Sequence, residues 1–176
     1  MSIKKIINIA VLIFLLNLSN SAIATSSETG GVGTAFTKNS TSIGIVLGSG
    51  SAFNDDYYVL GGSVGYYLLD GLEIGVDAQY WFSGDPSIFK VSPQVRYVFT
   101  QPEVINPYIG AFYTRAFIDS DFLDDQDSYG YRAGAYFSTD NRVYIGAGFA
   151  YEDYKDCPKQ LDCSNTYPEL LFQVSF

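Results

Sequence analysis

Histidine is absent from the 176-residue chain, and methionine and tryptophan occur once each. Serine hydrolases use histidine as the general base that activates the nucleophile, so this chemistry is not open to the chain. We find no other nucleophile in the sequence that is accompanied by a plausible general base. We therefore expect a protein that is not an enzyme and that carries no cofactor.

Long apolar runs are absent after Ala24, which excludes a membrane-spanning helix in that part of the chain. The one apolar run comes earlier, over residues 6–18, between a basic start and the tripeptide AIA at 22–24, in which two small residues flank position 23. This order is typical of a secretory signal peptide. We expect residues 1–24 to be cleaved, because the alternative, an anchor helix, needs a longer run.

Positive charge is scarce, with 10 Lys and Arg against 19 Asp and Glu and a net charge of -9. Loss of Lys4 and Lys5 with the signal peptide makes the net charge more negative still, at -11. Nucleic acids repel such a chain, so we expect no nucleic-acid partner.

Only two cysteines occur, Cys157 and Cys163, in the polar segment DCPKQLDC. In an exported protein, two close cysteines predict a disulfide bond. The alternative, a zinc site, lacks further ligands nearby.

Two regions follow the signal peptide. Residues 25–39 are rich in Gly, Ser and Thr. This composition predicts a flexible N-terminal lead. The alternative is a segment that partly plugs the barrel interior. Residues 40–176 have the length of one domain.

Glycine, tyrosine and phenylalanine are abundant, with 17, 15 and 13 residues. Aromatic residues favour strands and glycine disfavours helices. The segment LEIGVDAQYWF at 72–82 shows the strand period of two, with apolar and polar residues alternating. Eight such segments are expected, over residues 42–51, 57–68, 72–82, 89–99, 107–117, 129–137, 142–152 and 167–176.

The connections between these segments alternate in kind. Short turns are expected at 69–71, 100–106 and 138–141. The other connections are more acidic, and two of them, 118–128 and 153–166, are longer. Long loops at one end and short turns at the other are typical of bacterial outer-membrane barrels.

Charged residues of most segments fall on one face of the expected strands, together with Gly and Ser. This set predicts a polar network, and its members are Glu73, Asp77, Lys90, Arg96, Arg132, Arg142 and Glu169. Folding the hairpin about residues 83–88 brings Asp77 near Gln94 and Glu73 within diagonal reach of Arg96. On segment 107–117, placing Arg115 with the charged set puts Ile109 and Tyr113 on the same face.

Alternation alone also fits a soluble barrel with its charges outside. Small residues beside the charges favour instead the narrow interior of an eight-stranded barrel. Aromatic residues crowd the strand ends, as in the girdles at membrane boundaries. They include Tyr57, Tyr58, Tyr66, Tyr67, Tyr80, Trp81 and Phe82. The sequence therefore predicts an all-β fold, an eight-stranded antiparallel up-and-down transmembrane β-barrel with a polar interior.

Phrases such as GYYLLDGLEIGV and NPYIGAFY, with the terminal LFQVSF, resemble the small outer-membrane β-barrel family that includes OmpX, Ail, OmpW and the membrane domain of OmpA. The resemblance covers nearly the whole mature chain. It implies location in the outer membrane and contact with its lipids and lipopolysaccharide. It also implies a C-terminal signal for the barrel-assembly machinery, matched by Leu170, Phe172, Val174 and Phe176.

Two functions remain open at this point. A satisfied polar core would plug the barrel and leave a structural or surface-interaction role to the acidic loops, with a host or surface ligand as partner. The alternative is a narrow channel or small-ligand conduit, for which Leu171, Ile109 and Tyr113 are candidate inward apolar residues.

Loop acids also suggest a weak calcium site. Asp119, Asp121, Asp124, Asp125 and Asp127 offer hard oxygen ligands, although the spacing lacks the central glycine of an EF-hand loop. The alternative is a solvated acidic loop.

Overall fold

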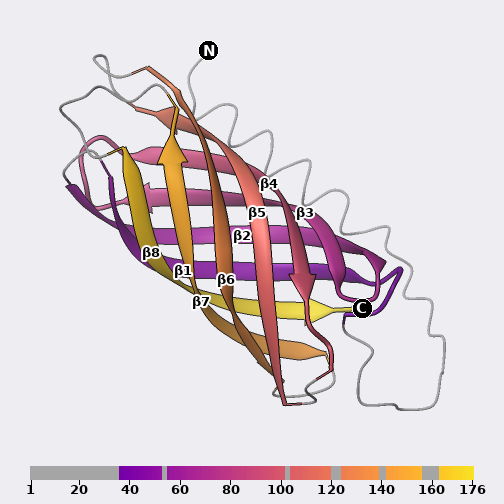
Figure 1. The fold of residues 1–176 in the computed structure, drawn as a ribbon. Coiled ribbons are helices and arrows are strands. Elements are labelled where there is room, and N and C mark those ends of the chain that lie inside the picture. The colour runs from indigo at the N-terminus through magenta and orange to yellow at the C-terminus, as the bar shows by residue number, and fades with distance from the viewer. Residues whose placement is uncertain (1–35, 53–54, 102–103, 120–123, 139–141, 156–162) are drawn as a thin grey trace, which may run out of the picture. The chain divides into compact units, whose positions relative to one another are not determined.

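A computed structural model describes residues 36–52, 55–101, 104–119, 124–138, 142–155 and 163–176. It contains eight strands: β1 Thr41–Ala52, β2 Asp55–Leu69, β3 Leu72–Phe82, β4 Ile88–Val98, β5 Ile105–Ile118, β6 Gln126–Ser138, β7 Val143–Tyr154 and β8 Ser164–Ser175. Each strand pairs antiparallel with its sequence neighbour, and β8 pairs with β1 to close the barrel (Figure 1). The predicted fold class is confirmed. Within the described residues, no helix has the length and hydropathy to cross a bilayer.

The barrel has two ends of different character. At the turn end, β2 is joined to β3, β4 to β5 and β6 to β7, and Thr41 and Phe176 exchange two backbone hydrogen bonds. At the loop end the other four connections join the strands. The predicted signal peptide, and residues 25–35 of the predicted lead, lie outside the described residues.

Strands extend further at the loop end than the alternation of the sequence suggested. Strand β6 already begins at Gln126, and β7 and β8 reach Tyr154 and Ser164. The polar residues there continue the antiparallel ladder, with Ala116 opposite Gln126 and Asp153 opposite Ser164. The loops predicted over 118–128 and 153–166 are shorter for this reason.

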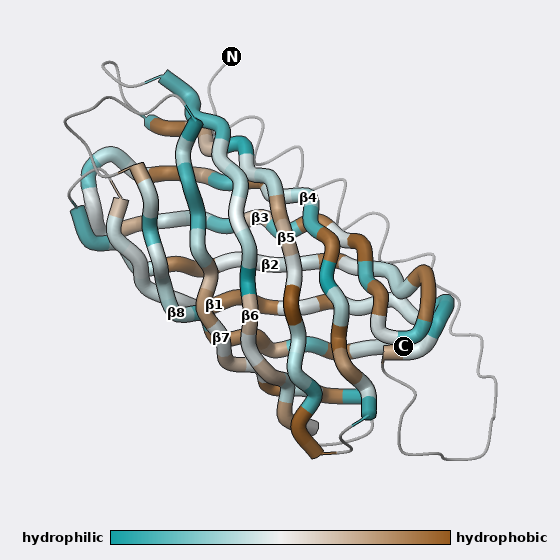
Figure 2. Tube along the Cα trace, in the orientation of Figure 1, coloured by the Kyte–Doolittle hydropathy of each residue, from teal (hydrophilic) through white to brown (hydrophobic). Residues whose placement is uncertain are grey.

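Hydropathy alternates along the strands of the closed sheet (Figure 2), and burial alternates with it, so successive side chains face opposite surfaces. Outward positions in the middle of the strands carry large apolar residues that are exposed, such as Ile45, Val76 and Phe172. Charged residues at outward positions of the strands occur only toward the loop end, among the described residues: Asp56, Arg115, Asp127 and Asp153. The outer surface therefore presents an uncharged belt, while the charges of mid-strand positions lie inside.

The last residues of the predicted lead contact the barrel. Residues 36–39 are bound to the barrel: the Phe36 carbonyl accepts from the Gly71 amide at 2.7 Å, and the Lys38 and Asn39 amides donate to Asp70 and Tyr67. Phe36 is buried, with its ring 4.6 Å from that of Tyr144. Residues 36–39 therefore pack against the turn end of the barrel, because an aromatic side chain gains by leaving water.

Candidate functional site

The interior of the barrel holds six of the seven residues of the predicted polar network. Glu73, Asp77, Lys90, Arg96, Arg132 and Glu169 are all buried. They form three groups that follow one another from the turn end to the loop end. Alternation places them inward because strand residues two apart share a face.

The group at the turn end centres on Arg96. Its guanidinium lies 3.5 Å from the Glu73 carboxylate and donates hydrogen bonds to Tyr136 and to Gln94. The Ser42 hydroxyl donates to the other Glu73 oxygen. Arg96 and Glu73 are direct neighbours in the β3–β4 register.

The expected hairpin register was wrong by two residues. Asp77 lies opposite Ser92, and Gln94 lies opposite Gly75. The centre of the turn between β3 and β4 therefore lies closer to the end of β3 than we expected from the sequence. The shift by an even number keeps every side chain on its predicted face.

Arg132 holds the middle group. Its Nη2 lies 2.9 Å from Asp77 Oδ2, and its Nη1 lies 3.7 Å from Glu169 Oε2. The Tyr108 hydroxyl donates to the second Glu169 oxygen at 3.0 Å. One cation thus links β6 to β3 and β8 across the barrel.

Lys90 forms the centre of the group at the loop end. Its Nζ donates to Glu152 Oε2 at 2.6 Å and to the Tyr154 hydroxyl at 2.7 Å. It also lies 3.6 Å from the centre of the Trp81 ring. A buried ammonium requires such partners, since an isolated charge in a low dielectric is very costly.

The network contains residues that the sequence analysis missed. Glu152 and Trp81 share the parity of inward residues on β7 and β3, so the alternation itself was a sufficient signal. Trp81, Tyr57 and Tyr67 were assigned to the membrane girdles, but all three are buried inside. Their neighbours Tyr58, Tyr66, Tyr80 and Phe82 are the exposed ones.

Four residues on predicted inward faces lie elsewhere. Arg142 is exposed, one residue before β7 begins, so it is not part of the interior network. Ile109 and Tyr113 are exposed as well, together with Arg115. On β5 the other parity faces inward, with Tyr108, Phe112 and Thr114, because the apolar outer belt outweighs one terminal arginine.

Apolar side chains close the interior at both ends. One buried cluster lies at the loop end and includes Trp81, Tyr57 and Tyr167. The other lies at the turn end and includes Phe36, Tyr136 and Leu171. The inward position predicted for Leu171 is confirmed. Together with the three charged groups, these clusters fill the narrow lumen expected of eight strands.

The acids of the loop end pair with arginine. Arg115 Nη1 lies 2.9 Å from Asp127, and its Nη2 lies 3.7 Å from Asp125. A cation at this place would have to displace Arg115. Asp121 lies outside the described residues, and within those that are described no cluster of three acids or cysteines could hold a metal ion.

The structure describes the residues of the predicted C-terminal signal but only one of the two predicted disulfide cysteines. Cys157 lies outside the described residues, so its pairing with Cys163 stays a prediction. Leu170, Phe172, Val174 and Phe176 are all exposed on the outer surface.

Comparison with family models finds no match for the chain, and comparison with curated proteins finds none either. Solved structures do match. The N-terminal β-barrel domain of Pseudomonas aeruginosa OprF is 20% identical over 79% of this chain and 98% of that domain, with a TM-score of 0.59. Neisserial surface protein A is 18% identical over 78% of this chain and 96% of its own, with a TM-score of 0.61.

Two further matched structures are an attachment invasion locus protein and an enzyme. Ail, the attachment invasion locus protein of Yersinia pestis, is 17% identical over 80% of this chain and all of its own, with a TM-score of 0.50. The outer membrane enzyme PagL is 15% identical over 76% of this chain and 98% of its own, with the same TM-score. At these identities the likeness shows the fold alone: the chain has the fold of the small eight-stranded outer-membrane β-barrels.

Proposed function

We propose that this chain is an outer-membrane barrel with a sealed interior, which acts as a structural or surface-interaction protein through its loop end. The observation that carries the proposal is the division of charge between the two surfaces of one sheet. Lys90, Arg96 and Arg132 are buried inside with their acids, while the belt outside has no charge among the described residues. Such a belt suits hydrocarbon, where an exposed charge costs about 2–4 kcal/mol at the midplane.

The sealed interior supports a role at the surface over a conduit. An ion that crosses the lumen would have to part Arg132 from Asp77 and Lys90 from Glu152, both of which are buried pairs. Breaking a buried pair costs about 3–5 kcal/mol for each pair. Neither step is offset by water in a lumen that side chains fill.

Conductance of the refolded protein in planar bilayers tests the seal. We expect no steady current steps, because the three charged groups and the two apolar clusters occlude the lumen. The double variant Arg96→Ala/Tyr136→Ala, which shortens two side chains at the turn end, is the matched comparison and should stay closed as well, because the Arg132 and Lys90 groups still occlude the lumen. Steady ion-selective current steps from the parent chain would establish the conduit function and contradict the proposed sealed interior.

The loop end is the proposed contact surface for a host or surface ligand. Acidic residues gather there, including Asp55, Asp56 and Asp124. A variant with residues 156–162 replaced by Gly and Ser should lose cell adhesion or serum resistance when displayed on a bacterial surface. The same replacement of 139–141, at the turn end, is the control; equal binding by parent and loop variant would refute a surface role for this loop.

Assembly through the barrel-assembly machinery is part of the proposal. Phe176 ends the chain beside β1, where its backbone pairs with Thr41. We expect Phe176→Ala to reduce the amount of assembled barrel in cells, while refolding into detergent stays unchanged because the backbone pairing is retained. An equal loss in both assays would mean that Phe176 acts through stability and is not read as a signal.

The proposed barrel has no catalytic activity, unlike the matched outer membrane enzyme PagL. The absence of histidine supports this part of the proposal. Incubation of the refolded barrel with radiolabelled lipid A and phospholipid should leave both intact, and release of a fatty acid would overturn this part.

A further inference from the structure

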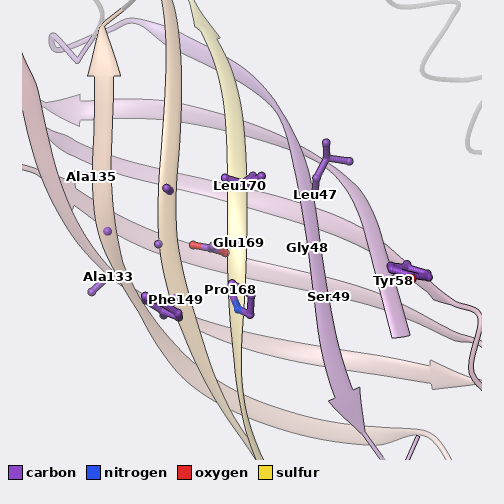
Figure 3. A pocket seen from close by; sticks show the side chains of 13 residues that line it. Leu47, Gly48, Ser49, Tyr58, Ala133, Ala135, Phe149, Pro168, Glu169 and Leu170 are labelled. Atoms are coloured by element: carbon purple, nitrogen blue, oxygen red, sulfur yellow. The ribbon is translucent and has the colours of Figure 1, made fainter. Parts of the chain in front are cut away.

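A polar hollow of about 530 Å³ lies on the outer surface of the barrel toward the loop end, where β1, β2 and β8 meet. Its volume falls within the roughly 300–1,000 Å³ of small-molecule sites. It adjoins the apolar hollow drawn in Figure 3, because Ser49, Tyr58 and Pro168 line both. The polar hollow therefore begins where the apolar belt ends.

The hollow forms because the ladder between β1 and β8 ends early. Their register stops at Gly48 opposite Glu169, although β1 stays paired with β2 as far as Ala52 and β8 stays paired with β7 as far as Ser164. The next residue of β8 toward the loop end is Pro168, which has no N–H to continue the ladder. Both strands thus extend past the end of their mutual pairing.

Main-chain donors and acceptors face the hollow for this reason. Thr41 and Phe176 exchange two backbone hydrogen bonds, so every second residue of β1 from Thr41 directs its N–H and C=O toward β8. Ser51 belongs to this set, and the same register would place it opposite Thr166. The two residues line the hollow but are not register partners. Their main-chain groups can therefore bind a ligand that both donates and accepts hydrogen bonds.

Polar side chains complete the rim. The Ser51 hydroxyl donates to Asp56 Oδ1 at 2.8 Å, which orients the carboxylate and leaves Oδ2 to accept from a ligand. Ser83 adds a hydroxyl from the segment that follows β3. This segment packs tightly on the barrel, because a Cβ on Gly84 would lie 2.6 Å from the Tyr57 ring. The rim is therefore formed before any ligand arrives.

Tyr58 provides an aromatic face beside these groups. Its side chain is 61% exposed, and its ring centre lies 6.1 Å from that of Phe82. Phe82 does not line the hollow, whereas Tyr58 does. An exposed aromatic face next to hydroxyls and a carboxylate fits a ligand that has both an apolar face and a polar rim.

Sugar rings have this combination, with C–H groups on their faces and hydroxyls that donate and accept around the edge. We propose that the polar hollow binds an uncharged saccharide, with one ring stacked on Tyr58 and its hydroxyls on Asp56 and the main chain of Ser51. A carboxylate strengthens the hydrogen bonds that hydroxyls donate to it. The same charge, with no Lys or Arg among the described lining residues, repels sulfated or carboxylated sugars.

This inference deepens the proposed function and rests on it, since the loop end must lie at the cell surface for a saccharide to reach the hollow. Two sources supply uncharged sugar units at such a surface. One is the sugar chain of the surrounding lipopolysaccharide, and the other is the glycan coat of another cell. Both present the same hydroxyl-rich rings, so the probes below separate them.

Titration of the refolded barrel with oligosaccharides, in a detergent that has no sugar headgroup, tests the site. The probes are uncharged oligosaccharides cleaved from lipopolysaccharide, uncharged glycans of animal cell surfaces, and sulfated forms of both. We expect at least one uncharged probe to bind with a Kd of about 1 mM or tighter, and its sulfated form to bind about tenfold more weakly. The uncharged set that binds more tightly identifies the source.

Two variants locate the binding. Tyr58→Ala and Asp56→Asn should each weaken it by about tenfold. Tyr131→Ala and Asp153→Asn are the matched controls and should bind like the parent. Tyr131 is 59% exposed on β6, Asp153 occupies an outward position on β7, and neither lines the hollow.

Failure of the parent to bind any uncharged probe would overturn the saccharide site, as would equal binding by the parent and both hollow variants. Tighter binding of the sulfated probes would overturn it too. Adhesion through the loop over 156–162 is a separate measurement of the proposed function. Loss of adhesion in that loop variant, with no saccharide bound by the parent, would refute this inference and leave the surface role standing.

Discussion

At the scale of single residues, the barrel interior depends on the pairing of each buried charge. Lys90 shows this most clearly, because its ammonium is surrounded by the Glu152 carboxylate, the Tyr154 hydroxyl and the Trp81 ring. Removing one partner leaves the other charge buried without compensation. The loss is therefore larger than the net value of the pair in the intact protein.

Lys90→Met should lower the free energy of unfolding by about 3–5 kcal/mol, because it strands Glu152. Urea unfolding in vesicles can follow the fluorescence of Trp81, the sole tryptophan, which lies beside the substituted residue. The double variant Lys90→Met/Glu152→Leu should cost less than the single one. Arg115→Met is the control: its pairs are exposed, so a change of about 0–1 kcal/mol is expected. A loss for Lys90→Met no larger than that of the control would contradict the paired interior.

At the scale of elements, the tight turn between β2 and β3 shows what a connection requires. Gly71 has a φ of 78°, in the left-handed region that side chains disfavour. A Cβ there would lie 2.3 Å from the Val98 carbonyl oxygen. Its amide donates to the Phe36 carbonyl and its carbonyl accepts from the Val98 amide, so this one residue joins the turn to the N-terminal segment and to β4.

Gly71→Ala should lower the free energy of unfolding by about 1–3 kcal/mol, from backbone strain and the clash with Val98. The urea midpoint of the refolded barrel measures the change. Gly62→Ala provides a control on β2, because a Cβ at Gly62 would make only an ordinary van der Waals contact, with the Gly44 carbonyl oxygen 3.8 Å away. The control should be neutral or slightly stabilising, and an equal cost at both sites would show that the turn geometry is not responsible.

At the scale of the whole molecule, the closed sheet sorts charge between two environments. The interior accepts ion pairs because strands across the barrel, as well as neighbouring ones, supply partners at fixed distances. The outer surface offers no such partners in its middle part, where exposed side chains are apolar. The same residue type therefore has opposite consequences on the two faces of one strand.

Val76→Lys tests this division at the middle of β3, where Val76 is exposed. In vesicles it should lower the free energy of unfolding by about 2–4 kcal/mol, since the ammonium faces hydrocarbon. Thr41→Lys, at the turn end of the belt, should cost only about 0–1 kcal/mol, because its ammonium reaches water. If both variants unfold at the same urea concentration as the parent, the belt does not face lipid.

Alternation along each strand determined much of this protein from the sequence alone. A period of two is local, so it predicted eight strands, the antiparallel barrel and the inward position of six charged residues without knowledge of their partners. The same pattern held enough information to place Glu152 and Trp81 inside. It was weakest on β5, where Arg115 near the strand end competed with the apolar residues that define the outer belt.

Only the tertiary structure decided which side chains meet. Lys90 and Glu152 are 62 residues apart, and Arg132 reaches Asp77 and Glu169 on two other strands. These contacts depend on closure of the sheet and on a register that local alternation leaves free by steps of two. The buried position of Phe36 also depends on strands far apart in the sequence, because its ring lies near those of Tyr67, Tyr136 and Tyr144. No local pattern contains these contacts.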